Sequence, residues 1–490
     1  MYYPSLEEVK KHRKEGNLMP VYREIVADLE TPVSAFLKIN QGGYSFLLES
    51  IEGGQRLARY SFIGTEPYRM LTTRGEDKAD SLPLIAEELS KYKIVPISGL
   101  PRFCGGAVGY LSYEAVTRFE KLPSPDRDSL GLPESLFMFV DTMLVFDHVT
   151  HKIKVLSHVR LDGDIETAYQ EAVGRIDNLV ERLSQPLKPS QQMKAATRPV
   201  NNYKLSSNFS KEQFEEGILK IKQYITDGEA IQVVLSQRLA QPTDAAPFEI
   251  YRALRTINPS PYMFFLDFTD FHIIGASPEI LVRVEDGAVM TRPLAGTRPR
   301  GKSPAEDAML EQELRGDEKE RAEHIMLVDL GRNDIGRVSE PGTVKVSDLM
   351  DVERYSHVMH LVTHVQGKLR QGLSAFDALR ACFPAGTVSG APKIRAMEII
   401  AELEPEKRGP YAGAVGYFSF SGNMDMSIAI RTMVMTKGVT YTQAGCGIVY
   451  DSVPEREYEE SLNKARALLK AVNQAENKDE ISGGNHAVVD

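Results

Sequence analysis

Residues 412–435, with the sequence AGAVGYFSFSGNMDMSIAIRTMVM, decide the fold class because they contain two strand-like runs, Ala412–Phe420 and Ser427–Met435. Branched and aromatic residues of this kind are enriched in β-strands. Around these runs, residues 210–472 alternate strand and helix patterns. The further strands predicted are Ile231–Leu235, Tyr262–Asp267 and His272–Gly275, and the helices are Glu318–Leu330, Ala391–Leu403 and Glu455–Val472. The pattern predicts an α+β (or mixed α/β) protein with large, mostly antiparallel sheets and flanking helices.

The chain is predicted to divide near residue 200. Residues 184–208 contain three prolines and many Gln, Ser and Asn, which is typical of a linker. A helix begins directly afterwards, because Ser210 and Gln213 have the spacing of a capping box. The predicted organisation is an N-terminal region 15–185, a linker 186–209, a second region 210–472 and a disordered tail 475–490.

The N-terminal region mixes short strands with turns. Residues 44–50 are predicted to form a strand, residues 137–146 a buried strand, and residues 81–92 a helix.

Composition excludes several classes of protein. The net charge of −10, from 68 acidic and 58 basic residues, argues against nucleic acid as the main partner. Cys104, Cys382 and Cys446 are too far apart in sequence for a CxxC or zinc motif, which fits a reducing compartment. The first residues lack the apolar segment of a signal peptide, and Leu136–Phe146 is shorter than the about 20 residues of a membrane span. We therefore expect a cytoplasmic protein without a membrane segment.

Two pairs of acidic residues stand out in the predicted helices. Glu320 and Glu323 are three residues apart, as are Glu457 and Glu460, so each pair shares one helix face. Two such faces turned to one cavity would offer the oxygen ligands that Mg²⁺ prefers. The alternative is that both pairs are solvated helix surface, where acidic residues are common.

Three glycine-containing segments could bind an anion. In residues 290–301, Gly296 and Thr297 lie between arginines, and backbone N–H groups with a hydroxyl can bind a carboxylate. Residues 444–449 contain a Gly-Cys-Gly sequence, and residues 383–393 contain Gly386 and Gly390 without the spacing of a phosphate loop. Basic surface turns, tight strand packing and a structural loop are the respective alternatives.

A histidine and a cysteine near these segments are more ambiguous. Strand alternation places His360 on one face with Val358 and Val362, where a histidine is usually a satisfied core residue. Cys446 fits a small apolar filler better than a nucleophile, since no Cys–His pair is evident.

Taken together, these segments resemble the family of chorismate-using enzymes, and within it the large subunits (component I) of anthranilate synthase. The matching stretches are GASPE (275–279), PLAGTRPR (293–300), EHIMLVDL (323–330), GTVSGAPK (386–393) and GCG (445–447). They occur in one order over most of residues 210–470. The resemblance implies that family's fold, a regulatory role for residues 15–185 and a chorismate-binding catalytic role for residues 210–472.

The resemblance also implies a metal site. Glu323 and Glu460 match the Mg²⁺ ligands, and Glu320 and Glu457 match residues that support the ion through water.

The remaining site residues follow from the same resemblance. The enolpyruvyl carboxylate of chorismate would be held by Tyr411, Arg431 and the backbone of Gly445, Cys446 and Gly447. The ring and its carboxylate would contact Gly296, Thr297 and His360, and Glu279 matches the proposed general acid. A protonated carboxyl suits that role because hydroxide is a poor leaving group.

Two positions discriminate within the family. Relatives that make aminodeoxychorismate carry a lysine where this chain has Ala295, and relatives that add water carry a lysine base where it has Gln232. Neither alanine nor glutamine can replace those lysines. Both departures favour anthranilate, with aminodeoxychorismate as the runner-up product.

The resemblance finally implies two partners. No glutaminase motif is evident, so ammonia is expected from a separate glutamine amidotransferase subunit. Glu49 and Ser50, together with Pro261, Tyr262 and Met263, match a site for inhibitory L-tryptophan. A non-catalytic tryptophan-binding regulator is the alternative from another class, but it would have lost the metal carboxylates or Arg431.

Overall fold

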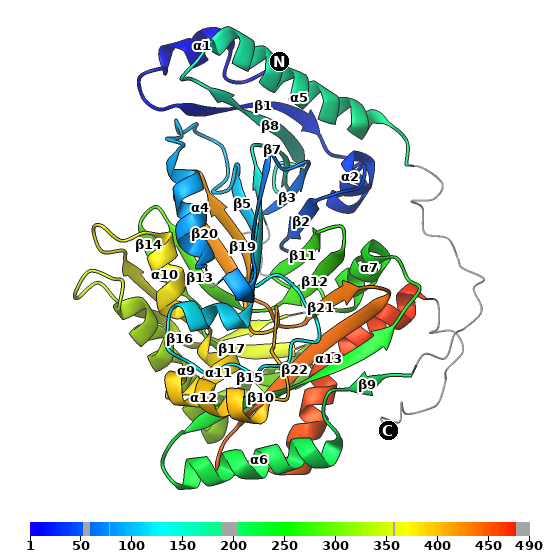
Figure 1. Cartoon of the computed structure of the whole chain (residues 1–490), viewed down its shortest axis with the longest axis vertical. Coiled ribbons are helices and arrows are strands. Elements are labelled where there is room, and N and C mark those ends of the chain that lie inside the picture. The colour runs from blue at the N-terminus through cyan, green and yellow to red at the C-terminus, as the bar shows by residue number, and fades with distance from the viewer. Residues whose placement is uncertain (52–58, 78, 188–203, 356–357, 477–490) are drawn as a thin grey trace.

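The computed structural model describes residues 1–51, 59–77, 79–187, 204–355 and 358–476. Two large antiparallel sheets form its centre, and helices lie on their outer faces (Figure 1). A core cluster containing Phe46 and Phe264 from one sheet and Tyr110 and Val415 from the other fills the space between them. Because that cluster belongs to both sheets, each needs the other to bury its inner face.

The larger sheet has twelve strands within the described residues, in the order β1-β8-β7-β3-β2-β11-β12-β21-β22-β10-β18, with β9 paired to β10. Its strands are β1 (Leu18–Val26), β2 (Ser45–Glu49), β3 (Tyr60–Thr65), β7 (Thr142–Asp147), β8 (Lys152–Arg160), β9 (Ser206–Ser207), β10 (Gln232–Pro242), β11 (Tyr262–Asp267), β12 (Phe271–Ser277), β18 (Gly390–Ala391), β21 (Thr432–Thr436) and β22 (Val439–Ile448).

The second sheet has ten strands within the described residues, in the order β15-β17-β14-β13-β20-β19-β5-β6-β4, with β16 paired to β17. Its strands are β4 (Arg69–Thr73), β5 (Gly106–Leu111), β6 (Ser135–Val140), β13 (Ile280–Glu285), β14 (Ala288–Thr291), β15 (Leu294–Pro299), β16 (Lys345–Arg354), β17 (Val358–Lys368), β19 (Ala414–Ser419) and β20 (Met424–Ile428).

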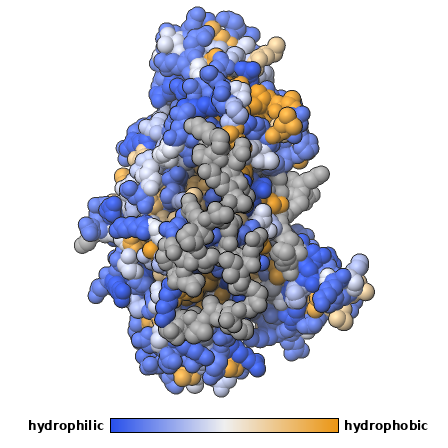
Figure 2. All heavy atoms as spheres, turned by 90° about the vertical axis from the view of Figure 1, so that its right-hand side faces the viewer, coloured by the Kyte–Doolittle hydropathy of each residue, from blue (hydrophilic) through white to orange (hydrophobic). Residues whose placement is uncertain are grey.

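Helices pack on the outer faces of both sheets. The α-helices are α1 (Leu6–Lys11), α2 (Pro32–Ile39), α4 (Ser81–Ser90), α5 (Ile165–Ser184), α6 (Lys211–Thr226), α7 (Pro247–Ile257), α8 (Pro304–Gly316), α9 (Glu318–Gly336), α10 (Ala375–Cys382), α11 (Gly386–Ser389), α12 (Lys393–Leu403) and α13 (Pro454–Ala475). Short 3₁₀ turns, η1 (Gly75–Asp77) and η2 (Tyr113–Arg118), complete the set. No helix among the described residues is long and apolar enough to cross a membrane. The described residues visible in Figure 2 are mostly hydrophilic, with hydrophobic atoms in small patches.

Both sheets contain strands from both halves of the chain. Strand β2 pairs with β11, with Glu49 opposite Met263, and β5 pairs with β19, with Leu111 opposite Ala414. Both sheets therefore continue across the predicted boundary between regions 15–185 and 210–472. Of the predicted linker and tail, residues 188–203 and 477–490 lie outside the described residues.

The fold class predicted from the sequence is confirmed, and several elements match closely. Strand β11 has the predicted bounds, and α6 begins with the predicted capping box, in which Ser210 and Gln213 exchange hydrogen bonds. Two predicted strands were wrong, however, because each is two strands in different sheets. Residues 137–146 divide between β6 and β7 at Asp141, and residues 427–435 divide between β20 and β21. The strands on either side of each break are buried and apolar, and only the half-buried Asp141–Thr142 and Arg431 interrupt them, so hydrophobic periodicity alone joined each pair into one strand.

A first stability test concerns Gly174, which is exposed in the interior of α5 and has no atom within 4 Å of an added Cβ. Glycine costs about 0.5–1 kcal/mol relative to alanine inside a helix, because it loses more backbone entropy on folding. Gly174→Ala should raise the free energy of unfolding by about that amount. Urea denaturation followed by circular dichroism measures the change, and an unchanged or lower midpoint would contradict it.

Candidate active site

Glu279 lies between β12 and β13 and is buried at 6% exposure. Burial raises the pKa of this carboxyl to about 8, and the nearby Thr387 hydroxyl and Arg292 charge oppose that shift only in part. A small cavity of about 30 Å³ lies beside it, lined also by Thr387 of α11 and Leu327 of α9. Glu279 therefore keeps its proton at neutral pH and can donate it.

A β-bulge presents Gly296 and Thr297 beside His360. The register of β15 against β17 shifts between Ala295 and Arg298, and Gly296 takes a φ of 68°, which favours glycine. His360 Nδ1 lies 2.8 Å from the Gly296 carbonyl oxygen and 3.1 Å from Thr297 Oγ1. Since a carbonyl can only accept, Nδ1 carries the proton and Nε2 holds the lone pair. Burial lowers the pKa of His360, so the ring is neutral and Nε2 can accept a proton.

The two acidic pairs lie on α9 and α13, as predicted. Burial and the neighbouring charge of Glu323 raise the pKa of Glu320, and burial and Glu460 raise the pKa of Glu457, against an opposing Ser452 hydrogen bond. Glu323 accepts a hydrogen bond from Gln232 Nε2 at 3.3 Å. Among the described residues, no three His, Cys, Asp or Glu side chains are close enough together to hold a metal ion. Within each pair, however, the two carboxylates repel each other, and a bound cation would reduce that repulsion.

Basic side chains that sequence reasoning missed lie against these carboxylates. Lys464 pairs with Glu460 at 2.6 Å and donates to the Gly445 carbonyl at 3.0 Å, and Arg298 lies 3.5 Å from Glu320. The i, i+4 spacing of Glu460 and Lys464 on one helix was a usable signal. The contact of Arg298 depends on strand placement and gave none.

Tyr411, Arg431 and the Gly-Cys-Gly segment meet at the end of β22. The Tyr411 hydroxyl lies 3.0 Å from where a Cβ on Gly445 would stand, and Gln232 Nε2 lies 2.5 Å from a Cβ on Gly447. Arg431 sits at a φ of 51° where the chain passes from β20 to β21, and its guanidinium donates to the Lys464 carbonyl. Arg431 therefore lies beside Tyr411 and Gly445 because the chain crosses from one sheet to the other at this residue.

Cys446 is fully buried in this segment, and its thiol lies 4.0 Å from the Leu235 carbonyl. Burial raises the pKa of the thiol well above its usual range, so it is not a thiolate nucleophile.

Three contacts bring residues of the strand segments and of α9 close together. Gln232 connects Glu323 to Gly447, Glu320 borders Gly296, and the charge of Arg431 acts on His360.

The residues predicted for tryptophan line a separate cavity of about 890 Å³. All five border it: Glu49, Ser50, Pro261, Tyr262 and Met263. The Glu49 carboxylate already accepts hydrogen bonds from Tyr251 and Arg255 of α7. A ligand ammonium at Glu49 would therefore have to share that carboxylate with Arg255.

The two-sheet α+β fold and the carboxylate-lined site are typical of an enzyme that acts on a small molecule. The family model described as chorismate binding enzyme matches residues 43–470. The chain therefore belongs to the chorismate-binding enzyme family.

Its similarity to individual members is extensive. It is 51% identical to anthranilate synthase component 1 from Acetivibrio thermocellus, over 97% of this chain and 99% of that relative. The crystal structure of anthranilate synthase component I from Streptococcus pneumoniae superposes with a TM-score of 0.77 at 39% identity, covering 91% of this chain and 98% of that one. The menaquinone-specific isochorismate synthase of Escherichia coli shares the fold, with a TM-score of 0.70 at 20% identity over 95% and 98% of the two chains.

Gly445→Ala tests the prediction that Tyr411, Arg431 and the Gly-Cys-Gly segment bind a carboxylate. The added Cβ would stand 2.6 Å from the Leu235 carbonyl oxygen and 3.0 Å from the Tyr411 hydroxyl, so β22 or Tyr411 must move. We expect the KM for chorismate to rise about tenfold, which corresponds to about 1.4 kcal/mol. Gly163→Ala, which meets no atom within 4 Å, is the matched control in steady-state kinetics. A wild-type KM in Gly445→Ala would contradict this assignment.

Proposed function

We propose that this chain is the chorismate-converting component of an anthranilate synthase, which forms anthranilate and pyruvate from chorismate and ammonia with the help of Mg²⁺. The observation that carries the proposal is Gln232, which is 3% exposed and donates to Glu323. An amide stands there in place of the lysine base expected of a relative that adds water to the ring. The 51% identity to an anthranilate synthase component 1 supports the same conclusion.

No three carboxylates of the described residues converge in this structure, but those of α9 and α13 offer the oxygen ligands that a hard divalent cation prefers. The raised pKa values of Glu320 and Glu457 reflect burial and like-charge neighbours, and a cation would lower both costs. Glu323 and Glu460 would hold the ion, with Glu320 and Glu457 binding its water molecules. Bound there, Mg²⁺ would neutralise the ring carboxylate of chorismate and withdraw electrons from the ring.

The remaining side chains bind chorismate and supply a proton. Arg431 and Tyr411 hold the enolpyruvyl carboxylate through charge-assisted hydrogen bonds. Glu279 donates its proton to the departing ring hydroxyl, which leaves as water while ammonia adds to the ring carbon beside the carboxylate. The ring C–O bond to the enolpyruvyl group then breaks, and this group leaves as pyruvate after its methylene carbon takes up a proton. The ring carbon that bears the amino group loses a proton, and the ring becomes aromatic. His360 orients the ring through its contacts at Gly296 and Thr297, and its Nε2 can accept that proton.

The direct test is product identification. The purified chain is incubated with chorismate, MgCl₂ and an ammonium salt, and products are separated by liquid chromatography with fluorescence and mass detection. Anthranilate with stoichiometric pyruvate supports the proposal. Isochorismate, aminodeoxychorismate or unchanged chorismate would reject it.

We also propose that ammonia comes from a separate glutamine amidotransferase subunit and that the pair acts in the cytoplasm. Co-migration with such a subunit, and glutamine-dependent activity only in its presence, would support this arrangement. Glutamine-dependent activity from the purified chain alone would refute it.

Feedback inhibition by L-tryptophan is proposed for the cavity beside β2 and β11, and Met263→Ala tests it. Met263 is 1% exposed and lines the cavity, so truncation should weaken an indole contact while leaving the distant carboxylates in place. We expect the tryptophan concentration for half inhibition to rise at least about tenfold, the effect of losing about 1.4 kcal/mol of binding. Wild-type activity unchanged by saturating tryptophan would refute regulation itself.

A further inference from the structure

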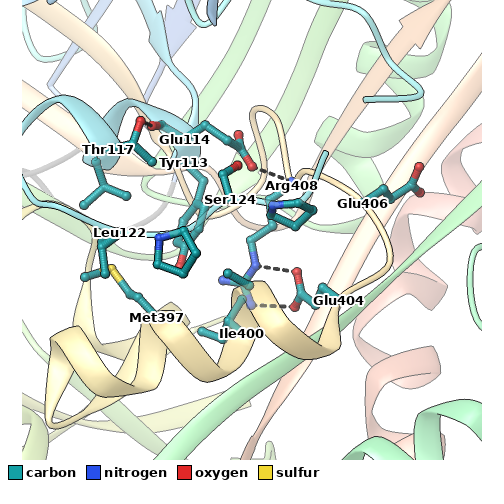
Figure 3. Close-up of a pocket in the computed structure, with 14 residues that line it drawn as sticks. Tyr113, Glu114, Thr117, Leu122, Ser124, Met397, Ile400, Glu404, Glu406 and Arg408 are labelled. Carbon is teal, nitrogen blue, oxygen red and sulfur yellow. Dashed lines mark hydrogen bonds and ion pairs between the residues drawn. The ribbon is translucent and has the colours of Figure 1, made fainter. Parts of the chain in front are cut away.

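The largest fully buried side chain of the described residues is that of Arg408, at 2% exposure, in the loop between α12 and β19. Its Nε and Nη2 donate to the Glu404 carboxylate at 2.8 and 2.6 Å. The dashed lines between Arg408 and Glu404 in Figure 3 mark these two contacts. A buried ion pair adds little net stability over a well-packed apolar pair, because both charges lose their water. Its donors, in contrast, fix the position of every group that accepts from them.

The groups fixed by Arg408 belong to separate parts of the active site. Nη1 donates to the Val388 carbonyl at 2.7 Å, in the helix that carries Thr387 beside Glu279. Nη2 also donates to the Val234 carbonyl of β10 at 2.8 Å, next to the segment that holds Gln232.

The same guanidinium lies beside the ring of Tyr411. Its carbon is 5.6 Å from the Tyr411 ring centroid and 4.7 Å from that of Tyr113, both within the range of cation–π contacts. Tyr411 in turn lies with its hydroxyl against Gly445. The buried guanidinium thus contacts the ring of a residue predicted to bind the substrate.

The backbone of the loop is held as well. Glu114 of η2 accepts from the N–H groups of Arg408 and Gly409, at 2.7 and 3.0 Å. Glu404 further accepts from the N–H and hydroxyl of Ser236, at 2.9 and 2.8 Å. The loop that leads into Tyr411 is therefore fixed at both its backbone and its side chain.

We propose that Arg408 is a positioning residue for chorismate binding: through Glu404 and Glu114 it holds the Tyr411 ring over Gly445 and keeps the Val388 turn in place. This inference rests on the proposed role of Tyr411. It predicts that Arg408 acts on the substrate through Tyr411, so the effects of altering the two residues must overlap.

A double-mutant cycle measures that overlap. Arg408→Lys keeps the charge but loses the bidentate geometry, and should raise the KM for chorismate about tenfold with kcat changed less than about threefold. Tyr411→Phe should also raise the KM about tenfold, and the double variant should stay near ten- to twentyfold instead of about a hundredfold. A hundredfold rise in the double variant would overturn the proposal.

Arg238→Lys is the matched control. Arg238 is also buried, at 4%, and pairs with Glu406 at 2.6 Å. It should lower the melting temperature as Arg408→Lys does but leave the KM unchanged. If Arg408→Lys behaves in the same way, its role is structural only and the proposal fails.

Glu114→Gln serves if Arg408→Lys does not fold. It leaves the pair of Arg408 with Glu404 intact and removes one backbone acceptor, so the KM should rise about threefold, and not at all in the Tyr411→Phe background. A folded Glu114→Gln protein with wild-type KM would overturn the proposal. Wild-type protein that forms no anthranilate would instead reject the proposed function, and chorismate affinity in these variants would then be compared by thermal shift.

Discussion

Glu323→Gln should lower kcat at least about a thousandfold at saturating Mg²⁺, equivalent to about 4 kcal/mol. Glu323 is the α9 carboxylate that meets Gln232, and the substitution removes one negative charge from the proposed ligand set. A neutral amide binds Mg²⁺ far more weakly than a carboxylate does. Wild-type protein should gain thermal stability on adding Mg²⁺, because a ligand of the native state stabilises it by mass action, and the variant should lose most of that gain.

Asp329→Asn is the control for Glu323→Gln. Asp329 lies on the same helix but is exposed, and it forms an ion pair with Arg332 at the surface, at 2.9 Å. Its kinetics and its response to Mg²⁺ should match those of wild type. Retained turnover in Glu323→Gln, or an equal loss in Asp329→Asn, would undo the metal assignment.

Glu279→Gln should lower kcat/KM by about 10²–10⁴, the usual contribution of a positioned general acid. The substitution keeps the shape of a buried side chain but leaves no proton to transfer. The pH profile gives the sharper signature. A general acid must be protonated to act, and burial raises the pKa of Glu279 to about 8, so activity is present below that pH and falls as pH rises through it.

The profile is recorded as kcat/KM for chorismate at a constant concentration of free ammonia, since ammonium itself titrates with pH. Wild type should fall about tenfold per unit above pH 8, and Glu279→Gln should lose this limb. Asp334→Asn is the control, because Asp334 lines the same small cavity but pairs with Lys393 at 2.8 Å. It should lose stability and keep the limb. A limb that persists in Glu279→Gln would assign the proton to another group.

Features that depend on residues close together in sequence could be predicted from the sequence. Helix boundaries such as that of α6 follow from a capping box, and strand β11 follows from its composition. The carboxylate pairs of α9 and α13 were visible because i, i+3 spacing fixes a shared helix face. The absence of lysine at Ala295 and Gln232 is a property of the sequence alone, and it narrows the proposed chemistry to ammonia.

Only the tertiary structure decided how these pieces meet. Asp141 and Arg431 mark places where an apolar run leaves one sheet for the other, and hydrophobic periodicity reports burial but not the neighbour that provides it. Contacts far apart in sequence were equally hidden, such as the hold of Glu114 on the backbone of Arg408 across 294 positions. The sequence thus predicted which groups would carry the chemistry. Long-range strand pairing and buried charge determined the geometry of those groups, because such interactions are set by the whole fold rather than by adjacent residues.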